Sequence, residues 1–160
     1  MTTTVVFCSQ EAVASVDAHR QKGGSGAVGD ITQMPSGKVV TGGADGHVAV
    51  LDPRRGYQVV ARIPVGDFVY SLASVGAFIS FYFRMGNCTD LTLTGPMVLA
   101  GTGAGHMHVI DVDDWETPRV MYALGANKAA VRVIALGGDG AHCACAGDDG
   151  GVVSYSFERG

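Results

Sequence analysis

VVTGGADGHVAVLD, at Val39–Asp52, has the pattern of a strand, a tight Gly/Asp turn and a second strand. The pattern returns as VLAGTGAGHMHVID at Val98–Asp111 and as ACAGDDGGVVSYSF at Ala144–Phe157. Gly and Asp suit the turn because it needs positive φ, which Gly adopts freely and Asp tolerates. Nearly continuous apolar runs on both sides of the turn indicate strands that are covered on both faces. The three stretches therefore predict sheets that are stacked between other sheets.

The spacing of the turns supports a repeat of this unit. The interval from Gly46 to Gly105 is longer than the interval from Gly105 to Gly150, and it contains a stretch unlike the rest, Ala77–Gly95. Once this stretch is removed, both intervals fall within about 40–45 residues, a period that is typical of propeller blades with four strands in each.

The repeats resemble the WD40 family in their turns and strand ends. Asp45-Gly46 and Asp149-Gly150 match the family's turn, and Leu51-Asp52 and Ile110-Asp111 stand where the family often has Trp-Asp. The resemblance covers 27–157. It implies an all-β, WD40-like partial β-propeller with about three four-stranded blades. It also implies a eukaryotic, non-catalytic scaffold for protein–protein interaction in a larger complex.

The sequence also departs from the family pattern. Leu51, Ile110 or Tyr155 replaces the usual Trp, and no recognisable Gly-His pair precedes a blade. In the family, this His and this Trp belong to a hydrogen-bonded His/Ser/Asp/Trp network.

The expected organisation starts with N-terminal strands and a loop over 1–26, in which Ala12–His19 is a strand or a short helix and Gln21–Gly26 is a flexible loop. Three repeats follow over 27–157, and 158–160 is a tail. The repeats are expected at 27–63, at 68–124 with an insert at 77–95, and at 131–157. Three blades cannot close a ring, because propellers have 4–8. The end blades should therefore expose apolar faces that a second copy, a partner chain or sequence missing from this chain would cover.

The insert Ala77–Gly95 leaves several alternatives open. Its Phe residues suit a hydrophobic interaction loop, and its pattern also suits a longer β-hairpin or a disordered insert. Its length corresponds to that of a short unspliced intron, so a gene-model artefact is a further alternative.

Composition excludes several classes of protein. The net charge is −4 without a basic cluster, which argues against nucleic-acid binding. The N-terminus lacks the pattern of a signal peptide, and no apolar run reaches the length of about 20 residues that a membrane span needs. The four cysteines occur without a secretory context, which predicts a cytoplasmic or nuclear protein.

Candidate catalytic, cofactor and metal sites are all better explained by structure, and we expect none of them. The glycines of Gly101–Gly105 are followed by a strand pattern, whereas a dinucleotide-binding turn needs a helix. On a strand, His142 would face away from Cys143 and Cys145, so these side chains do not converge as zinc ligands do. A propeller-based enzyme, or an accessory domain of one, remains the alternative function. It would be favoured if His47, His106, His108 and Asp111 shared one pocket.

The candidate partner-binding residues lie in two polar loops that connect strands, at 53–56 and at 113–118. Propellers bind partners through such loops, and aromatic residues often dominate interfaces. The candidate residues are Trp115, Arg54, Arg55, Asp113 and Asp114. Trp115 either packs back on its blade or serves as an exposed anchor for another protein.

Overall fold

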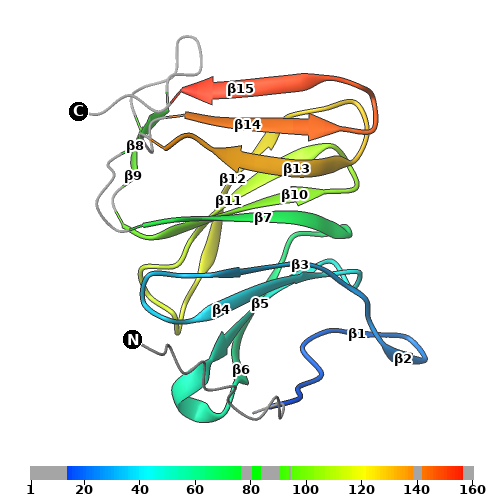
Figure 1. The fold of residues 1–160 in the computed structure, drawn as a ribbon, viewed down its shortest axis with the longest axis vertical. Coiled ribbons are helices and arrows are strands. Elements are labelled where there is room, and N and C mark those ends of the chain that lie inside the picture. Colours follow the sequence, from blue (N-terminus) through cyan, green and yellow to red (C-terminus); the bar gives the residue numbers. More distant parts are fainter. Residues whose placement is uncertain (1–13, 77–80, 84–90, 94, 139–141, 157–160) are drawn as a thin grey trace, which may run out of the picture.

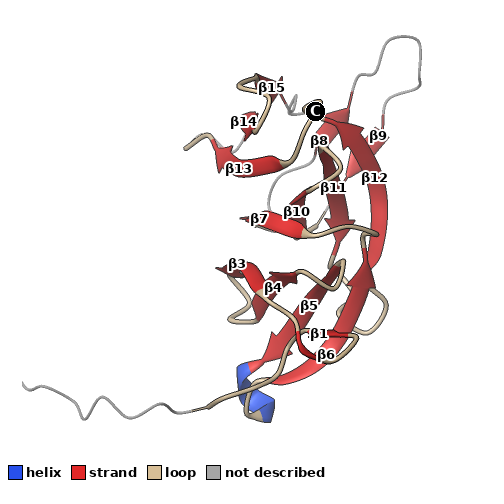
Figure 2. Ribbon diagram, turned by 90° about the vertical axis from the view of Figure 1, so that its right-hand side faces the viewer, coloured by secondary structure: helices blue, strands red, loops and turns tan. Residues whose placement is uncertain are grey.

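The structure is a computed structural model that describes residues 14–76, 81–83, 91–93, 95–138 and 142–156. It is built almost entirely of strands, and three antiparallel sheets form its body. The three sheets follow one another along the chain and fan out around a curve (Figures 1 and 2). The protein is therefore an all-β, partial β-propeller, as the sequence predicted, and we call the sheets blades one, two and three.

The first two blades have four strands each, in chain order from the inside of the curve to the outside. Blade one consists of β3 (Val28–Gln33), β4 (Val39–Gly43), β5 (His47–Asp52) and β6 (Gln58–Pro64). Blade two consists of β7 (Val69–Val75), β10 (Met97–Thr102), β11 (His106–Asp111) and β12 (Arg119–Gly125).

Blade three has three strands among the described residues. They are β13 (Val131–Leu136), β14 (His142–Gly147) and β15 (Val152–Ser156). No fourth strand lies beside β15 among these residues, so the four strands implied for each blade are present in blades one and two.

The turn that recurs in the sequence recurs in the structure. Gly46, Gly105 and Gly150 have φ values of 73°, 81° and 74°, and each joins the second and third strands of its blade. Glycine is required here because this left-handed region is costly for residues with a Cβ. The turn at Gly105 leads into the strand β11 rather than a helix, so the cofactor-binding alternative lacks the structure that it needs.

Two hydrophobic clusters fill the spaces between blades. One lies between blades one and two and contains Val40, Val48, Val69, Val98 and Ile110 among others. The other lies between blades two and three and includes Leu99, Met107, Val131, Cys143 and Cys145. Both faces of blade two are therefore covered, which explains why its strands are apolar on both sides.

Hydrogen bonds also join the inner strands of neighbouring blades. The Leu72 backbone N–H of β7 donates to Asp30 Oδ2 of β3 at 2.7 Å. The Ser71 hydroxyl donates to the Val131 carbonyl of β13 at 3.5 Å. Asp30 and Ser71 hold equivalent places, opposite Gly42 and Gly101, so the same position links each blade to the next.

The N-terminal segment differs from the prediction. Residues 14–19 form neither the strand nor the short helix that the sequence allowed, and they lie beside blade one as extended chain without regular pairing. The predicted flexible loop is instead part of a small hairpin of β1 (Arg20–Gln21) and β2 (Gly24–Ser25). The hairpin follows directly after His19, whose side chain binds the turn of blade one.

Within the insert, the structure describes two short strands, β8 (Phe81–Phe83) and β9 (Leu91–Leu93), which pair antiparallel. This pairing corresponds to the β-hairpin alternative. The rest of the insert, except Gly95, lies outside the described residues. No helix that the structure describes is long and apolar enough to cross a bilayer.

Candidate partner-binding site

Trp115 lies in the loop between β11 and β12, at the junction of blades one and two. Its side chain is half-buried and packs against the cluster between these blades. The ammonium of Lys38, from blade one, lies 5.5 Å from the centre of the indole ring. The two interpretations of Trp115 are therefore compatible, since one side of the ring packs inward and the remainder faces solvent.

The loop around Trp115 is held by its own hydrogen bonds. Asp114 accepts from the Glu116 backbone N–H at 2.9 Å and from the Thr117 hydroxyl at 2.6 Å. The Thr117 hydroxyl and then the Glu116 N–H lower the pKa of Asp114 below its usual value. Asp114 therefore stabilises the turn that presents the indole.

The second predicted loop begins with a 3-10 helix over Pro53–Arg55, capped by Asp52. Asp52 accepts from the Arg54 backbone N–H at 2.9 Å and from Lys38 Nζ at 3.1 Å. The Arg54 N–H and then Lys38 lower the pKa of this carboxyl. Arg54 and Arg55 are exposed, and no ion pair joins either guanidinium to a carboxylate of the described residues.

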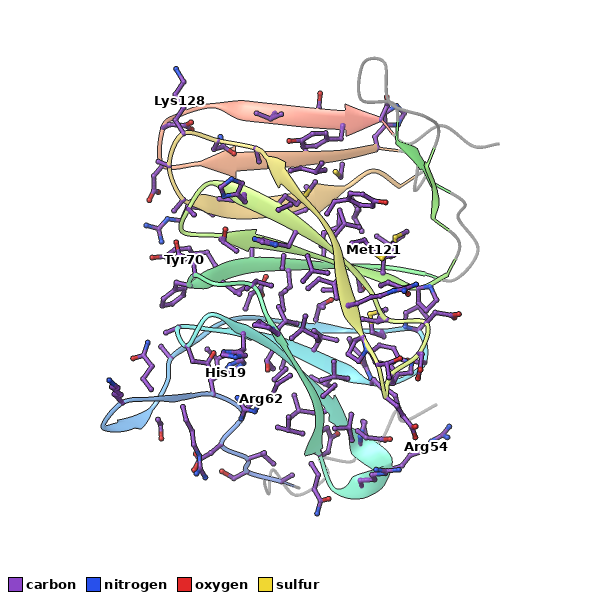
Figure 3. The ribbon with its side chains drawn as sticks, turned by 180° about the vertical axis from the view of Figure 1, so that it is seen from behind. His19, Arg54, Arg62, Tyr70, Met121 and Lys128 are labelled. Atoms are coloured by element: carbon purple, nitrogen blue, oxygen red, sulfur yellow. The ribbon has the colours of Figure 1, made fainter. Side chains whose placement is uncertain are left out.

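The two loops meet around two adjoining hollows of about 340 Å³ and about 500 Å³. Trp115, Lys38 and Asp52 line both of them. The first is also lined by Arg55, Val60, Asp113, Asp114 and Glu116, and the second by Ser36, Gly37, Pro53 and Arg54. The structure thus brings together all five residues that the sequence suggested. Figure 3 shows Arg54 at the opposite end of blade one from His19.

Sequence reasoning missed two residues of this site. Lys38 follows a Pro-Ser-Gly turn and gave no signal, because only the folded sheet places it over Trp115. Glu116 stood next to Trp115 in the sequence, and its acidic character was the one available signal. With Asp113 it lines the hollow that Arg55 also lines.

Among the residues of the enzyme alternative, His47 and Asp111 contact different partners and belong to different blades. His47 Nδ1 lies 2.8 Å from the Asp45 carbonyl, and Asp111 pairs with Arg119 at 3.4 Å. The His106 and His108 ring centres are 6.3 Å apart. Burial and then the neighbouring His106 lower the pKa of His108, which favours its neutral form. In the described part of the chain, no three His, Cys, Asp or Glu residues are placed to hold a metal.

The two cysteines of β14 belong to the core. Cys143 and Cys145 are both buried between blades two and three, and Cys145 Sγ lies 3.4 Å from Met107 Sδ. The hydrogen bond with Cys145 and then burial raise the pKa of the Cys143 thiol. His142 is exposed, so it does not join them as a ligand.

At the other end of the blades, His19 is tied to the turn of blade one. His19 is 1% exposed, its Nδ1 donates to Asp45 Oδ1 at 2.8 Å, and its Nε2 pairs with the Thr41 hydroxyl at 2.9 Å. Asp45 also accepts from the Arg20 and His47 backbone N–H groups and from the Arg62 guanidinium. Figure 3 shows His19 and Arg62 close together.

Sequence analysis did not single out His19. It follows Ala18 rather than a glycine, and the hairpin β1–β2 separates it from β3. Its contacts with Thr41 and Asp45 are visible only in the folded structure.

The chain is similar in structure to a chain of a crystal structure of a mitotic checkpoint complex. The TM-score is 0.61 and the sequence identity is 17%. The likeness covers 86% of this chain and 37% of that chain, so the present chain spans well under half of its neighbour's length. At this identity the likeness shows the fold alone. No family model matches the sequence, and no curated protein matches it either.

Proposed function

We propose that this chain is a WD40-type protein whose function is non-catalytic protein binding in a larger assembly. The observation that carries the proposal is the convergence of Trp115, Arg54, Arg55 and the acidic loop on two adjoining hollows. The similarity to a chain of a multiprotein complex supports it. We propose the cytoplasm or the nucleus as its location, because the predicted setting is reducing.

The chemistry of the site favours an extended peptide that carries both signs of charge. An acidic side chain of the peptide would pair with Arg54 and Arg55, which have no carboxylate partner among the described residues. A basic side chain would pair with Asp113 and Glu116, which line one of the two hollows. The half-buried indole of Trp115 lines both hollows, and a rigid aromatic is the usual centre of such an interface.

A random-peptide phage library panned against the whole chain tests the proposal. Trp115 is the single Trp of the protein, so its fluorescence reports directly on peptides bound at the site. We expect the enriched peptides to change this fluorescence. We also expect the Arg54→Ala/Arg55→Ala variant to bind them more weakly, on the order of tenfold.

Lys128→Ala is the matched control, because Lys128 is a basic side chain on the far side of the molecule from Arg54 in Figure 3. It should leave binding unchanged. Two results would contradict the proposal: a library that yields no binding peptide, and peptides that bind Trp115→Ala as tightly as the unmodified chain.

A further inference from the structure

On the face of blade one that points away from blade two, the inner strand is apolar and exposed among the described residues. Val28 and Ile31 of its inner strand are 52% and 63% exposed. They line a hollow of about 330 Å³ together with Val39, Leu51 and the N-terminal segment at 14–18. We call this the receiving face, because the equivalent face of blades two and three packs against the preceding blade.

The equivalent positions in blades two and three pack against the preceding blade. The paired registers place Val28 with Val69 and Val131, and Ile31 with Leu72 and Ile134. Each of these four equivalents is buried, in the cluster between its blade and the preceding one. The receiving face of blade one therefore has the residue types of an interface between blades, without a blade against it in the described structure.

Blade three has an exposed face of the kind that packs against the following blade in blades one and two. In blades one and two, Val48 and Met107 lie near the start of the third strand and are fully buried against the following blade. Their equivalent in blade three is Val152, which is 72% exposed. Val133 holds the position of Asp30 and Ser71, whose polar groups contact the next blade, and it is 55% exposed. We call this the delivering face.

We infer that two copies of this chain join head to tail, with the delivering face of each against the receiving face of the other. The chain carries both halves of one interblade contact, and both are uncovered among the described residues. Two copies of three blades give six, within the range of 4–8 found in closed propellers, whereas three copies would exceed it. A contact between unlike faces closes into a ring when the rotation allows, so the expected product is a discrete dimer.

The sizes of the side chains fit this arrangement. The delivering faces of blades one and two include Val40 and Leu99, and the equivalent residue of blade three is Ala144. Ser154 likewise replaces the valines of the two other blades at the middle of the third strand. The smaller side chains of blade three leave room for residues 14–18, which line the hollow of the receiving face.

Light scattering after gel filtration of the full chain is the test. We expect a mass twice the 16.5 kDa of one chain. Ile31→Asp damages the receiving face and Val152→Asp the delivering face, so each variant alone should be monomeric. Burying an unpaired carboxylate should raise the dissociation constant on the order of a hundredfold. A mixture of the two variants should recover a dimer, because one of its two contacts then joins two intact faces and both carboxylates are confined to the other contact.

Val120→Asp is the matched control. Val120 is an exposed valine on the outer strand of blade two, outside both end faces, so this variant should remain dimeric. Circular dichroism checks that each variant folds, and Val28→Asp and Val133→Asp repeat the test at a second position of each face. A monomeric unmodified chain, species larger than a dimer, or a mixture that stays monomeric would overturn the inference. None of these results depends on the Trp115 site, which is tested separately.

Discussion

The recurrent turns of blades one and three are held in the same place by different chemistry. In blade one, the buried His19 binds Asp45, whose side chain is 6% exposed. In blade three, Asn127 donates to Asp149 at 2.9 Å, and both lie nearer the surface. The matching backbone bonds are also present, since the Arg20 N–H donates to Asp45 and the Lys128 N–H to Asp149.

Blade two lacks both partners of this contact. Gly66 stands at the place of His19 and Asn127, and Ala104 at the place of Asp45 and Asp149. Blade two is packed between two other blades, whereas blades one and three each have a single neighbour among the described residues. Blade two therefore holds its turn without an Asp carboxylate, through the bond from the Thr102 hydroxyl to the His106 carbonyl at 3.1 Å and through packing on both of its faces.

Removing the carboxylate of blade one is expected to have the largest effect. Asp45→Ala leaves His19 buried without its acceptor and also removes the bonds to Arg20 N–H and Arg62. We expect the free energy of unfolding to fall by about 3 kcal/mol in urea denaturation. Asp149→Ala is the matched variant in blade three and should cost clearly less, because water can replace its partners. Equal losses of unfolding free energy in the two variants would contradict the difference between the two turns.

Exchanging the donor between the two turns sharpens the comparison. His19→Ala removes both bonds of the ring and leaves a cavity, and should cost about 3 kcal/mol. His19→Asn places in blade one the residue that blade three uses, and its amide can still donate to Asp45. We expect it to recover roughly half of that loss, as measured by the denaturation midpoint. If His19→Asn is as damaging as His19→Ala, the two ties are not equivalent.

The repeat was predictable from the sequence, whereas the hydrogen bonds of His19 to Asp45 and of Asn127 to Asp149 were not. The turns at Gly46, Gly105 and Gly150 and the apolar strands beside them define the blades, because turn geometry and strand burial are local properties. His19 and Asn127 stand at different distances before their blades, and the hairpin β1–β2 intervenes in one case only. Their equivalence is visible only from the matching bonds that the Arg20 and Lys128 backbone N–H groups donate to Asp45 and Asp149.

The candidate binding site was likewise predictable from the sequence only in part. Trp115 and the two charged loops were identifiable as polar connections between strands. The place of Lys38 beside Trp115 depends on how blade one packs on blade two, and no pattern within either repeat encodes that packing.

The stability contributed by the tie of blade one should depend on pH. Burial alone would raise the pKa of Asp45, but the hydrogen bonds from His19 and from the Arg20 N–H outweigh it and lower the pKa below 3.8. A carboxyl with a lowered pKa in the folded state stabilises it above the unfolded value, and this stabilisation is lost as the pH falls toward the folded value. The difference in unfolding free energy between the unmodified chain and Asp45→Asn should therefore be constant above about pH 5 and shrink below about pH 4. A difference that stays the same down to about pH 3 would show that Asp45 has an ordinary pKa.

Introducing the Asn–Asp pair of blade three into blade two should have the smallest effect on stability. The Gly66→Asn/Ala104→Asp variant restores the two residue types of blade three at the equivalent places. Gly66 has a φ of 86°, which Asn tolerates, and a Cβ built there would meet nothing within 4 Å. His19 and Asn127 are not among the residues with positive φ, so their side chains leave the backbone in another direction. A double-mutant cycle should give a coupling of less than about 0.5 kcal/mol, because the new amide points away from the new carboxylate. A larger favourable coupling would mean that blade two lost its tie by substitution alone, and that its backbone can still accept one.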